Sequence, residues 1–169
     1  TKIVQSDATY YFKKGDVLLI PRNKLATVIN YPKDGQAHRT IVMHLSIERL
    51  RNFYINYNIK PKAPVLNKIY CFNYHPLLES CFASLIPYFD MKEIPHDIAA
   101  LKITEAISIL RTLDKEIDNV LANFEELGKI NLVDYMEKNY MFNMSMEKFG
   151  YLTGRSLTTF KRDFKKAFN

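Results

Sequence analysis

Residues 145–169 constrain the fold of this chain most, because they begin with a pattern that predicts one short, well-capped helix. Ser145 can cap the start of a helix, since its hydroxyl accepts a hydrogen bond from an otherwise unpaired backbone N–H. Met146, Phe149 and Leu152 then recur at a spacing that forms one apolar stripe. Gly150 lies beside this stripe, where a small residue would let a second helix approach closely.

A turn and a second helix are predicted directly after this stripe. Gly154 is the residue best able to take the positive φ that the end of a helix commonly needs. Ser156 is a second candidate cap, and Leu157, Phe160 and Phe164 would form the inward side of the next helix. Residues 155–169 contain one acid, Asp163, and five basic side chains: Arg155, Lys161, Arg162, Lys165 and Lys166.

Two short helices joined at a glycine turn, with cations on the second helix, have the layout of a helix-turn-helix. The second helix of such a unit enters the major groove of DNA. A basic amphipathic helix by itself is more often only a solvated face. The two caps, the turn glycine and the small residue at the expected crossing favour the DNA-binding interpretation.

The same residues resemble a known family of regulators. Ser145-Met-Glu-Lys, Gly154-Arg-Ser156, Phe160, Arg162 and the Phe164-Lys-Lys ending are similar to the first helix-turn-helix of bacterial AraC/XylS-type regulators. Residues 75–153 also resemble such regulators from Bacteroidetes-like bacteria, through His75-Pro-Leu-Leu, Leu101-Lys-Ile-Thr-Glu-Ala, Gly128-Lys-Ile and Tyr151-Leu-Thr-Gly-Arg-Ser.

The resemblance implies specific roles for the second helix, residues 156–168. Three residues would contact bases: Thr158, Lys161 and Arg162. Four would hold phosphates: Arg155, Ser156, Lys165 and Lys166. Arg162 is the strongest candidate for base recognition, because a guanidinium can bind guanine O6 and N7 together. The family carries two such units bridged by a long helix, whereas this sequence runs from Thr1, without Met, to Asn169, so we expect a fragment in which the second unit is absent.

Residues 1–74 are predicted to be rich in strands and turns. Lys13-Lys-Gly-Asp16 is a turn signal, and the expected strands are Val17–Ile20, Leu25–Asn30, Thr40–Leu45 and a returning strand within 65–72. The Gly15-Asp-Val and Ile20-Pro pattern resembles the cupin-like sensor domain of these regulators. The closely spaced histidines of metal-binding cupins are missing after Pro21, so no metal is expected. The four histidines are expected at surface or hydrogen-bonded core positions: His38, His44, His75 and His96.

Residues 75–128 are predicted to be helical. A helix from Pro95 to about Leu113 has apolar residues on more than one side, so it is either an internal core helix or one that also meets a partner subunit. The resemblance implies that it pairs two protomers, through Ile98, Leu101 and Glu105. A shorter helix is expected over 116–127, with Gly128 as a hinge before a supporting helix capped by Asn131.

Charge, hydrophobicity and cysteine content indicate which partners and which cellular compartment to expect for the chain. Residues 1–89 carry 12 basic and 5 acidic side chains, residues 90–128 carry 4 and 9, and residues 129–169 carry 8 and 4, so an acidic middle separates two basic ends. No run of 18 apolar residues is present, so we expect no membrane partner. Cys71 and Cys81 lack Cys-x-x-Cys spacing, and a reduced pair in a cytoplasmic protein is expected.

These patterns predict an α+β chain with three parts. They are a partial cupin-like β domain (1–74), a helical linker and dimerisation region (75–128) and an all-α helix-turn-helix unit (129–169). We expect an AraC-type, sequence-specific regulator that binds double-stranded DNA as a homodimer, with a possible small-molecule effector and no cofactor. No catalytic constellation is seen, so an enzyme is not expected. The alternative is a non-metal cupin-like module for small-molecule binding or dimerisation, whose basic helix is only solvated.

Overall fold

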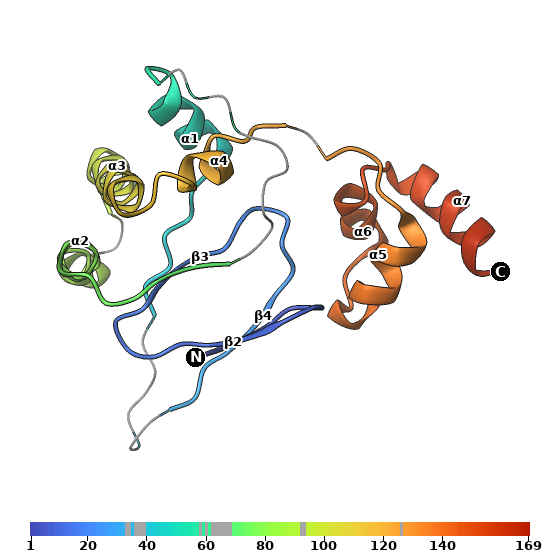
Figure 1. The fold of residues 1–169 in the computed structure, drawn as a ribbon, viewed down its shortest axis with the longest axis horizontal. Coiled ribbons are helices and arrows are strands. Elements are labelled where there is room, and N and C mark those ends of the chain that lie inside the picture. The colour runs from blue at the N-terminus through green and yellow to red at the C-terminus, as the bar shows by residue number, and fades with distance from the viewer. Residues whose placement is uncertain are drawn as a thin grey trace. The chain divides into compact units, whose positions relative to one another are not determined.

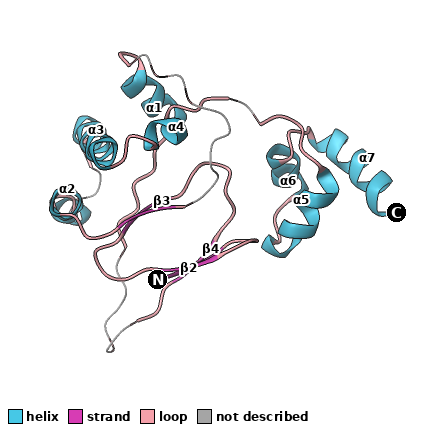
Figure 2. Cartoon of the chain, viewed as in Figure 1, coloured by secondary structure: helices cyan, strands magenta, loops and turns pink. Residues whose placement is uncertain are grey.

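The computed structural model describes residues 1–32, 35, 40–57, 59, 61, 69–91, 94–125 and 127–169. Small antiparallel sheets near the N-terminus are followed by helices, so the predicted α+β class is confirmed (Figures 1 and 2). The chain forms two compact units. Unit 1 comprises Thr1–Phe12, Arg22–Gln36 and Glu125–Asn169, and unit 2 comprises Lys13–Pro21 and Ala37–Phe124.

A three-stranded antiparallel sheet belongs to unit 1. Its order is β2 (Thr9–Tyr11), β1 (Lys2–Val4) and β4 (Thr27–Ile29). Ile3 lies opposite Tyr10 in one neighbour and Val28 in the other, and its side chain is almost fully buried. The expected strand at Leu25–Asn30 is therefore present in shortened form.

A two-stranded antiparallel sheet belongs to unit 2. It pairs β3 (Val17–Leu19) with β5 (Tyr70–Phe72), and Leu18 lies opposite Cys71. The predicted turn before β3 is also present. Gly15 has a φ of +91°, and the Lys13 backbone N–H donates to Asp16 Oδ2 at 2.9 Å. The expected returning strand is confirmed at β5, while residues 62–68 before it lie outside the described part of the chain.

The strand expected at Thr40–Leu45 is not formed, and this prediction was wrong. Its alternating pattern does exist as alternating burial: Met43 and Leu45 pack against the core, while Val42 is 83% exposed. However, residues 40–46 pair with no described strand. An alternating pattern indicates which side chains face inward, but a strand also needs a neighbouring backbone for its hydrogen bonds.

Helices build the core of unit 2 together with its sheet. They are α1 (Ile47–Tyr54), α2 (Pro76–Ala83), α3 (His96–Leu113) and α4 (Ile117–Leu121), while the 3-10 helix η1 (Ile86–Asp90) between α2 and α3 has no buried residue. Ser46 caps α1 as predicted, and Pro76 starts α2 as predicted. The most deeply buried apolar side chains of this core are Leu78, Ile107 and Ile117.

The helix expected over 116–127 is much shorter, because α4 ends at Leu121. Asn123 and Phe124 have modest helix propensity, and Phe124 leaves the helical path to pack against the core of unit 2. Tertiary packing therefore overrides the apolar stripe that predicted a longer helix.

An arginine surrounded by aromatic rings links α1, α3 and α4 in unit 2. Arg111 lies over the rings of Phe53, Tyr54 and Tyr57, with the last centroid 4.1 Å from the guanidinium carbon. Its Nη2 also donates to Asp118 Oδ2 at 3.0 Å, and the Tyr54 hydroxyl donates to Asp118 Oδ1 at 2.7 Å. Burial, and then the neighbouring Asp118 carboxylate, raise the pKa of Tyr54 well above its ordinary range.

Candidate nucleic-acid interface

Two helices, α6 (Met146–Leu152) and α7 (Leu157–Phe168), lie where the sequence predicts a helix-turn-helix. Ser145 caps α6, because its Oγ accepts from the Lys148 backbone N–H at 3.3 Å. Phe149 and Leu152 are buried as expected, whereas Met146 is more than half exposed. The inward stripe of α6 is therefore narrower than its sequence predicts.

The turn between the helices is closed by backbone bonds and one buried hydroxyl. The Thr153 Oγ1 donates to the carbonyl oxygens of Phe149 at 2.8 Å and Gly150 at 3.1 Å. The Arg155 backbone N–H donates to the Gly150 carbonyl at 2.8 Å, and Gly154 has a φ of +67°. The positive φ predicted for Gly154 is thus confirmed, and it allows the chain to leave α6 sharply.

Two glycines permit close approaches around this turn. A Cβ added to Gly150 would lie 3.1 Å from the Arg155 carbonyl oxygen and 3.4 Å from the Phe160 Cβ, so the predicted close crossing of α6 and α7 is confirmed. A Cβ added to Gly154 would lie 2.4 Å from the carbonyl oxygen of Gly128. The segment that enters this region therefore packs directly against the turn.

Aromatic side chains fix the inner side of α7. Ser156 caps the helix, accepting from the Thr159 backbone N–H at 3.3 Å. Phe160 is 2% exposed, and its ring stacks with Phe149 at a centroid distance of 6.3 Å. Phe164 continues this row, with its ring 5.7 Å from that of Phe160.

A supporting helix, α5 (Leu132–Asn139), completes this small core. Asn131 caps it as predicted, because its Oδ1 accepts from the backbone N–H of Val133 at 3.0 Å. Leu132 and Met136 pack in the same cluster as Phe149 and Phe160. Both α5 and α6 therefore pack against the inner face of α7.

The outer face of α7 carries the residues predicted to contact bases. Thr158, Lys161 and Arg162 are all exposed. Their spacing of three and four residues places them on one side of the helix. Lys165 and Lys166, predicted to hold phosphates, are also exposed, one turn further along. Ser156 is exposed too, although its hydroxyl already takes part in the cap and donates to Thr159 Oγ1 at 3.0 Å.

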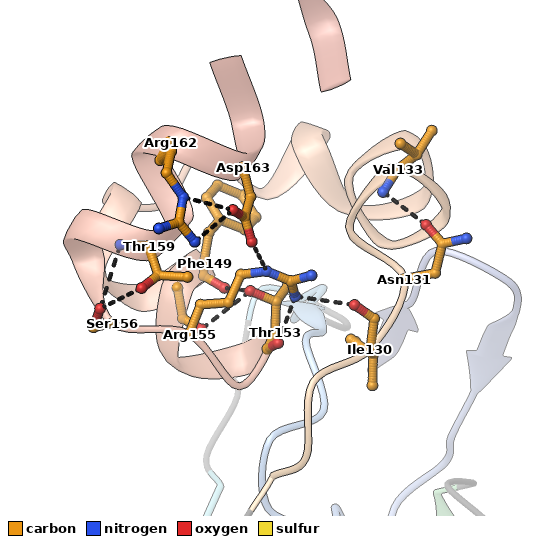
Figure 3. Close-up of polar contacts among 11 residues, drawn as sticks. Ile130, Asn131, Val133, Phe149, Thr153, Arg155, Ser156, Thr159, Arg162 and Asp163 are labelled. Carbon is orange, nitrogen blue, oxygen red and sulfur yellow. Dashed lines mark hydrogen bonds and ion pairs between the residues drawn. The ribbon is translucent and has the colours of Figure 1, made fainter. Parts of the chain in front are cut away.

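Arg155 lies in a different environment from the other predicted phosphate-binding residues. Its side chain is 11% exposed, and its Nη1 donates to the carbonyl oxygens of Ile130 at 2.9 Å and Thr153 at 2.7 Å (Figure 3). Its Nε donates to Asp163 Oδ2 at 3.1 Å. The guanidinium thus joins the entering segment, the turn and α7.

Asp163 binds two arginines through separate oxygens. Its Oδ2 accepts from Arg155, while its Oδ1 accepts from both Nε and Nη2 of Arg162, each at 3.2 Å (Figure 3). The hydrogen bond from Arg155 and the charge and hydrogen bonds of Arg162 hold the pKa of Asp163 below its usual range. The sequence patterns did not predict this role of Asp163. The signal available was that Asp163 is the single acid in an otherwise basic helix.

The residues predicted to pair protomers lie on α3 in unit 2. Leu101 is 69% exposed, Ile98 is half-buried, and the exposed Glu105 accepts from Lys102 Nζ at 2.9 Å. Their spacing puts them on one stripe of the helix, away from the fully buried Ile107. Along this stripe, the large apolar side chain of Leu101 is exposed to solvent.

The described residues contain no group of three or more His, Cys, Asp or Glu side chains that could hold a metal ion. His44 is exposed, and His38 lies outside the described residues. Among the described helices, none combines the length and apolar character that crossing a membrane requires.

A family model matches most of the chain. The model of the ExsA N-terminal regulatory domain matches residues 1–122. The chain belongs to this family. The ExsA N-terminal regulatory domain is a domain of AraC-family regulators, which agrees with the resemblance found in the sequence at the level of the regulator family. The match ends before α5, so α5, α6 and α7 lie outside the matched residues. No curated protein and no solved structure matches the chain.

Proposed function

We propose that this chain belongs to an AraC-type transcriptional regulator that binds double-stranded DNA sequence-specifically through α7. The observation that carries the proposal is the two-sided character of this helix. Phe160 and Phe164 anchor its inner side, while Thr158, Lys161 and Arg162 project into solvent on the outer side. A regulatory domain of the ExsA family in residues 1–122 supports the same conclusion.

The proposed roles follow from the chemistry of each exposed side chain. Arg162 binds the O6 and N7 of a guanine, Thr158 contacts a thymine methyl group, and Lys161 donates to a base edge. Lys165 and Lys166 hold phosphates on either side of the groove. These contacts place the protein on the duplex and select its sequence at the same time.

Ser156 and Arg155, the other two residues predicted to hold phosphates, are proposed to act in different ways. Ser156 lies at the N-terminus of α7, where backbone N–H groups and the helix dipole favour a phosphate oxygen. Arg155 contributes chiefly by positioning, because two of its guanidinium nitrogens already donate to groups of unit 1. Removal of the Arg155 side chain is therefore expected to destabilise the turn between α6 and α7 more than it weakens phosphate binding.

The proposed organisation keeps three functional parts: a cupin-like sensor in residues 1–74, a linker and dimerisation region in 75–128, and the first DNA-binding unit in 129–169. The stripe of α3 formed by Ile98, Leu101 and Glu105, in which Leu101 is an exposed apolar side chain, supports homodimer formation. A small-molecule effector would act on the sensor. The regulator is not an enzyme, and its DNA partner assigns it to the cytoplasm.

Fluorescence anisotropy with a randomised pool of labelled duplexes tests this proposal. The chain is compared with Arg162→Ala and with Lys138→Ala, which removes one exposed positive charge from α5 instead of α7. Binding at about 50 and 200 mM salt reports phosphate contacts, since each one adds about 0.9 to the salt slope.

The expected result is salt-sensitive binding that enriches one sequence motif. Arg162→Ala should lose about 1–3 kcal/mol of discrimination at one base pair. Lys138→Ala should keep the motif unchanged. If no motif is enriched, or if both variants change the preference equally, α7 is a solvated helix and the proposal is wrong.

A further inference from the structure

The carboxylate of Asp163 lies beside the arginine that is proposed to recognise a base. Neighbouring residues on a helix do not normally face each other, yet the long side chain of Arg162 turns back over Asp163. Both Nε and Nη2 of Arg162 donate to the same oxygen, Oδ1, at 3.2 Å (Figure 3). The Arg162 side chain is nevertheless 74% exposed, so it stays accessible to DNA.

The geometry leaves the far edge of the Arg162 guanidinium available. A guanidinium has five N–H donors, and Asp163 takes one from Nε and one from Nη2. The remaining donors lie on Nη1 and on the outer side of Nη2. Two donors on this edge match the O6 and N7 acceptors of guanine. The carboxylate therefore occupies the edge that base recognition does not require.

Asp163 is itself held in place by a second cation. Its other oxygen, Oδ2, accepts from Arg155 Nε at 3.1 Å, and Arg155 is fixed by the carbonyl oxygens of Ile130 and Thr153. An exposed arginine paired with a carboxylate that rotates freely would be held only weakly in one orientation. Here the acid is anchored on one side, so it can restrict the rotamers of Arg162 on the other.

We infer that Asp163 is a specificity-determining positioning residue, whose Oδ1 orients the Arg162 guanidinium for recognition of guanine in double-stranded DNA. The inference rests on the proposed function. Orientation before binding lowers the entropy lost when the side chain meets the base, so it strengthens the correct contact. The same negative charge repels the phosphates of every sequence equally.

Orientation of Arg162 strengthens binding to guanine, whereas the negative charge of Asp163 weakens binding to all DNA. Because these two effects on affinity are opposite, the role of Asp163 can be tested. Asp163→Asn keeps the size of the side chain but removes the charge that holds Arg162. The preference for guanine over other bases is expected to fall about two- to fivefold, the range of an exposed ion pair. Affinity for unrelated duplexes is expected to stay unchanged or to rise. A purely structural role would lower both.

A double-mutant cycle identifies the residue through which Asp163 acts. Base preference is measured by anisotropy for the parent chain, Asp163→Asn, Arg162→Ala and the double variant. In the Arg162→Ala background, Asp163→Asn should cause no further loss of preference. The inference is overturned if the preference of Asp163→Asn equals that of the parent, or if the loss persists without Arg162. If the parent itself lacks a guanine preference, or keeps it in Arg162→Ala, the proposed function fails, and this inference fails with it.

A measurement on the parent chain covers the case in which Asp163→Asn fails to fold. The Nε–H signal of Arg162 is observed by NMR in the DNA-free protein and assigned with Arg162→Lys. A hydrogen bond to Asp163 should slow its exchange with solvent relative to Arg49, whose Nε–H has no hydrogen bond among the described residues. Exchange as fast as that of Arg49 would show that Asp163 does not hold the guanidinium.

Discussion

Replacing Gly154 by alanine tests how the turn between α6 and α7 is built. Gly154 has a φ of +67°, in a region that side chains with a Cβ rarely adopt. An added Cβ would also lie 2.4 Å from the carbonyl oxygen of Gly128 and 2.8 Å from the backbone nitrogen of Lys129. Both neighbours are backbone atoms, so no side-chain rotation can relieve the overlap.

The expected cost has two parts. A positive φ at alanine costs about 1–2 kcal/mol. Moving the segment around Gly128 would also weaken the hydrogen bond from Arg155 to the Ile130 carbonyl and the one from the Ile130 N–H to the Thr153 carbonyl. Losing such bonds costs about 1–3 kcal/mol, because one donor is charged. The free energy of unfolding should therefore fall by about 2–5 kcal/mol.

The matched control is Gly35→Ala. Gly35 has a φ of +72° but nothing within 4 Å of an added Cβ, so this variant has the conformational cost alone. Urea denaturation followed by circular dichroism gives the overall loss of stability. Because the chain forms two units, amide hydrogen exchange of residues 145–169 is measured as well, to locate the loss.

Gly154→Asn separates the two parts of the cost. Asparagine tolerates positive φ better than alanine, but it carries the same Cβ. If the close approach dominates, the asparagine variant stays nearly as unstable as Gly154→Ala. The reasoning is refuted if Gly154→Ala loses no more stability than Gly35→Ala, or if asparagine restores the parent stability.

Three further predictions concern unit 2. Leu101→Asp should shift a homodimer to monomers in light scattering after size-exclusion chromatography, whereas Val42→Asp, at an apolar site that is even more exposed, should not; equal masses for all three proteins would contradict the α3 interface. Tyr54→Phe removes the hydroxyl that donates to a carboxylate of α4 at 2.7 Å, so the free energy of unfolding in urea should fall by about 1–2 kcal/mol; an unchanged midpoint would argue against this bond. Burial raises the pKa of the Cys81 thiol from 9.0 to about 11, so maleimide at pH 8 should label the exposed Cys71 first. The stability that this raised pKa contributes is complete below pH 9 and is lost as the pH rises toward 11. Because Cys81→Ala has no thiol at this position, its free energy of unfolding should not show this loss between pH 9 and 11.

Local signals in the sequence were sufficient for the helices near the C-terminal end. Ser145, Asn131 and Ser156 cap their helices as predicted, and Gly154 takes the predicted positive φ. Caps and turns depend on hydrogen bonds within a few residues, so sequence patterns report them well. The strand expected at 40–45 failed for the opposite reason, because a strand depends on a partner that is distant in the sequence.

The sequence by itself determined the α+β class, the capped helix pair and the set of cations on α7, since all three follow from composition and short-range spacing. Only the tertiary structure decided what each cation does. Arg155 and Arg162 have the same side chain, yet one is buried against Ile130 and Thr153 and the other is exposed. They differ because folding brings the segment after Gly128 and the Asp163 carboxylate against Arg155, and such contacts leave no periodic pattern in the chain.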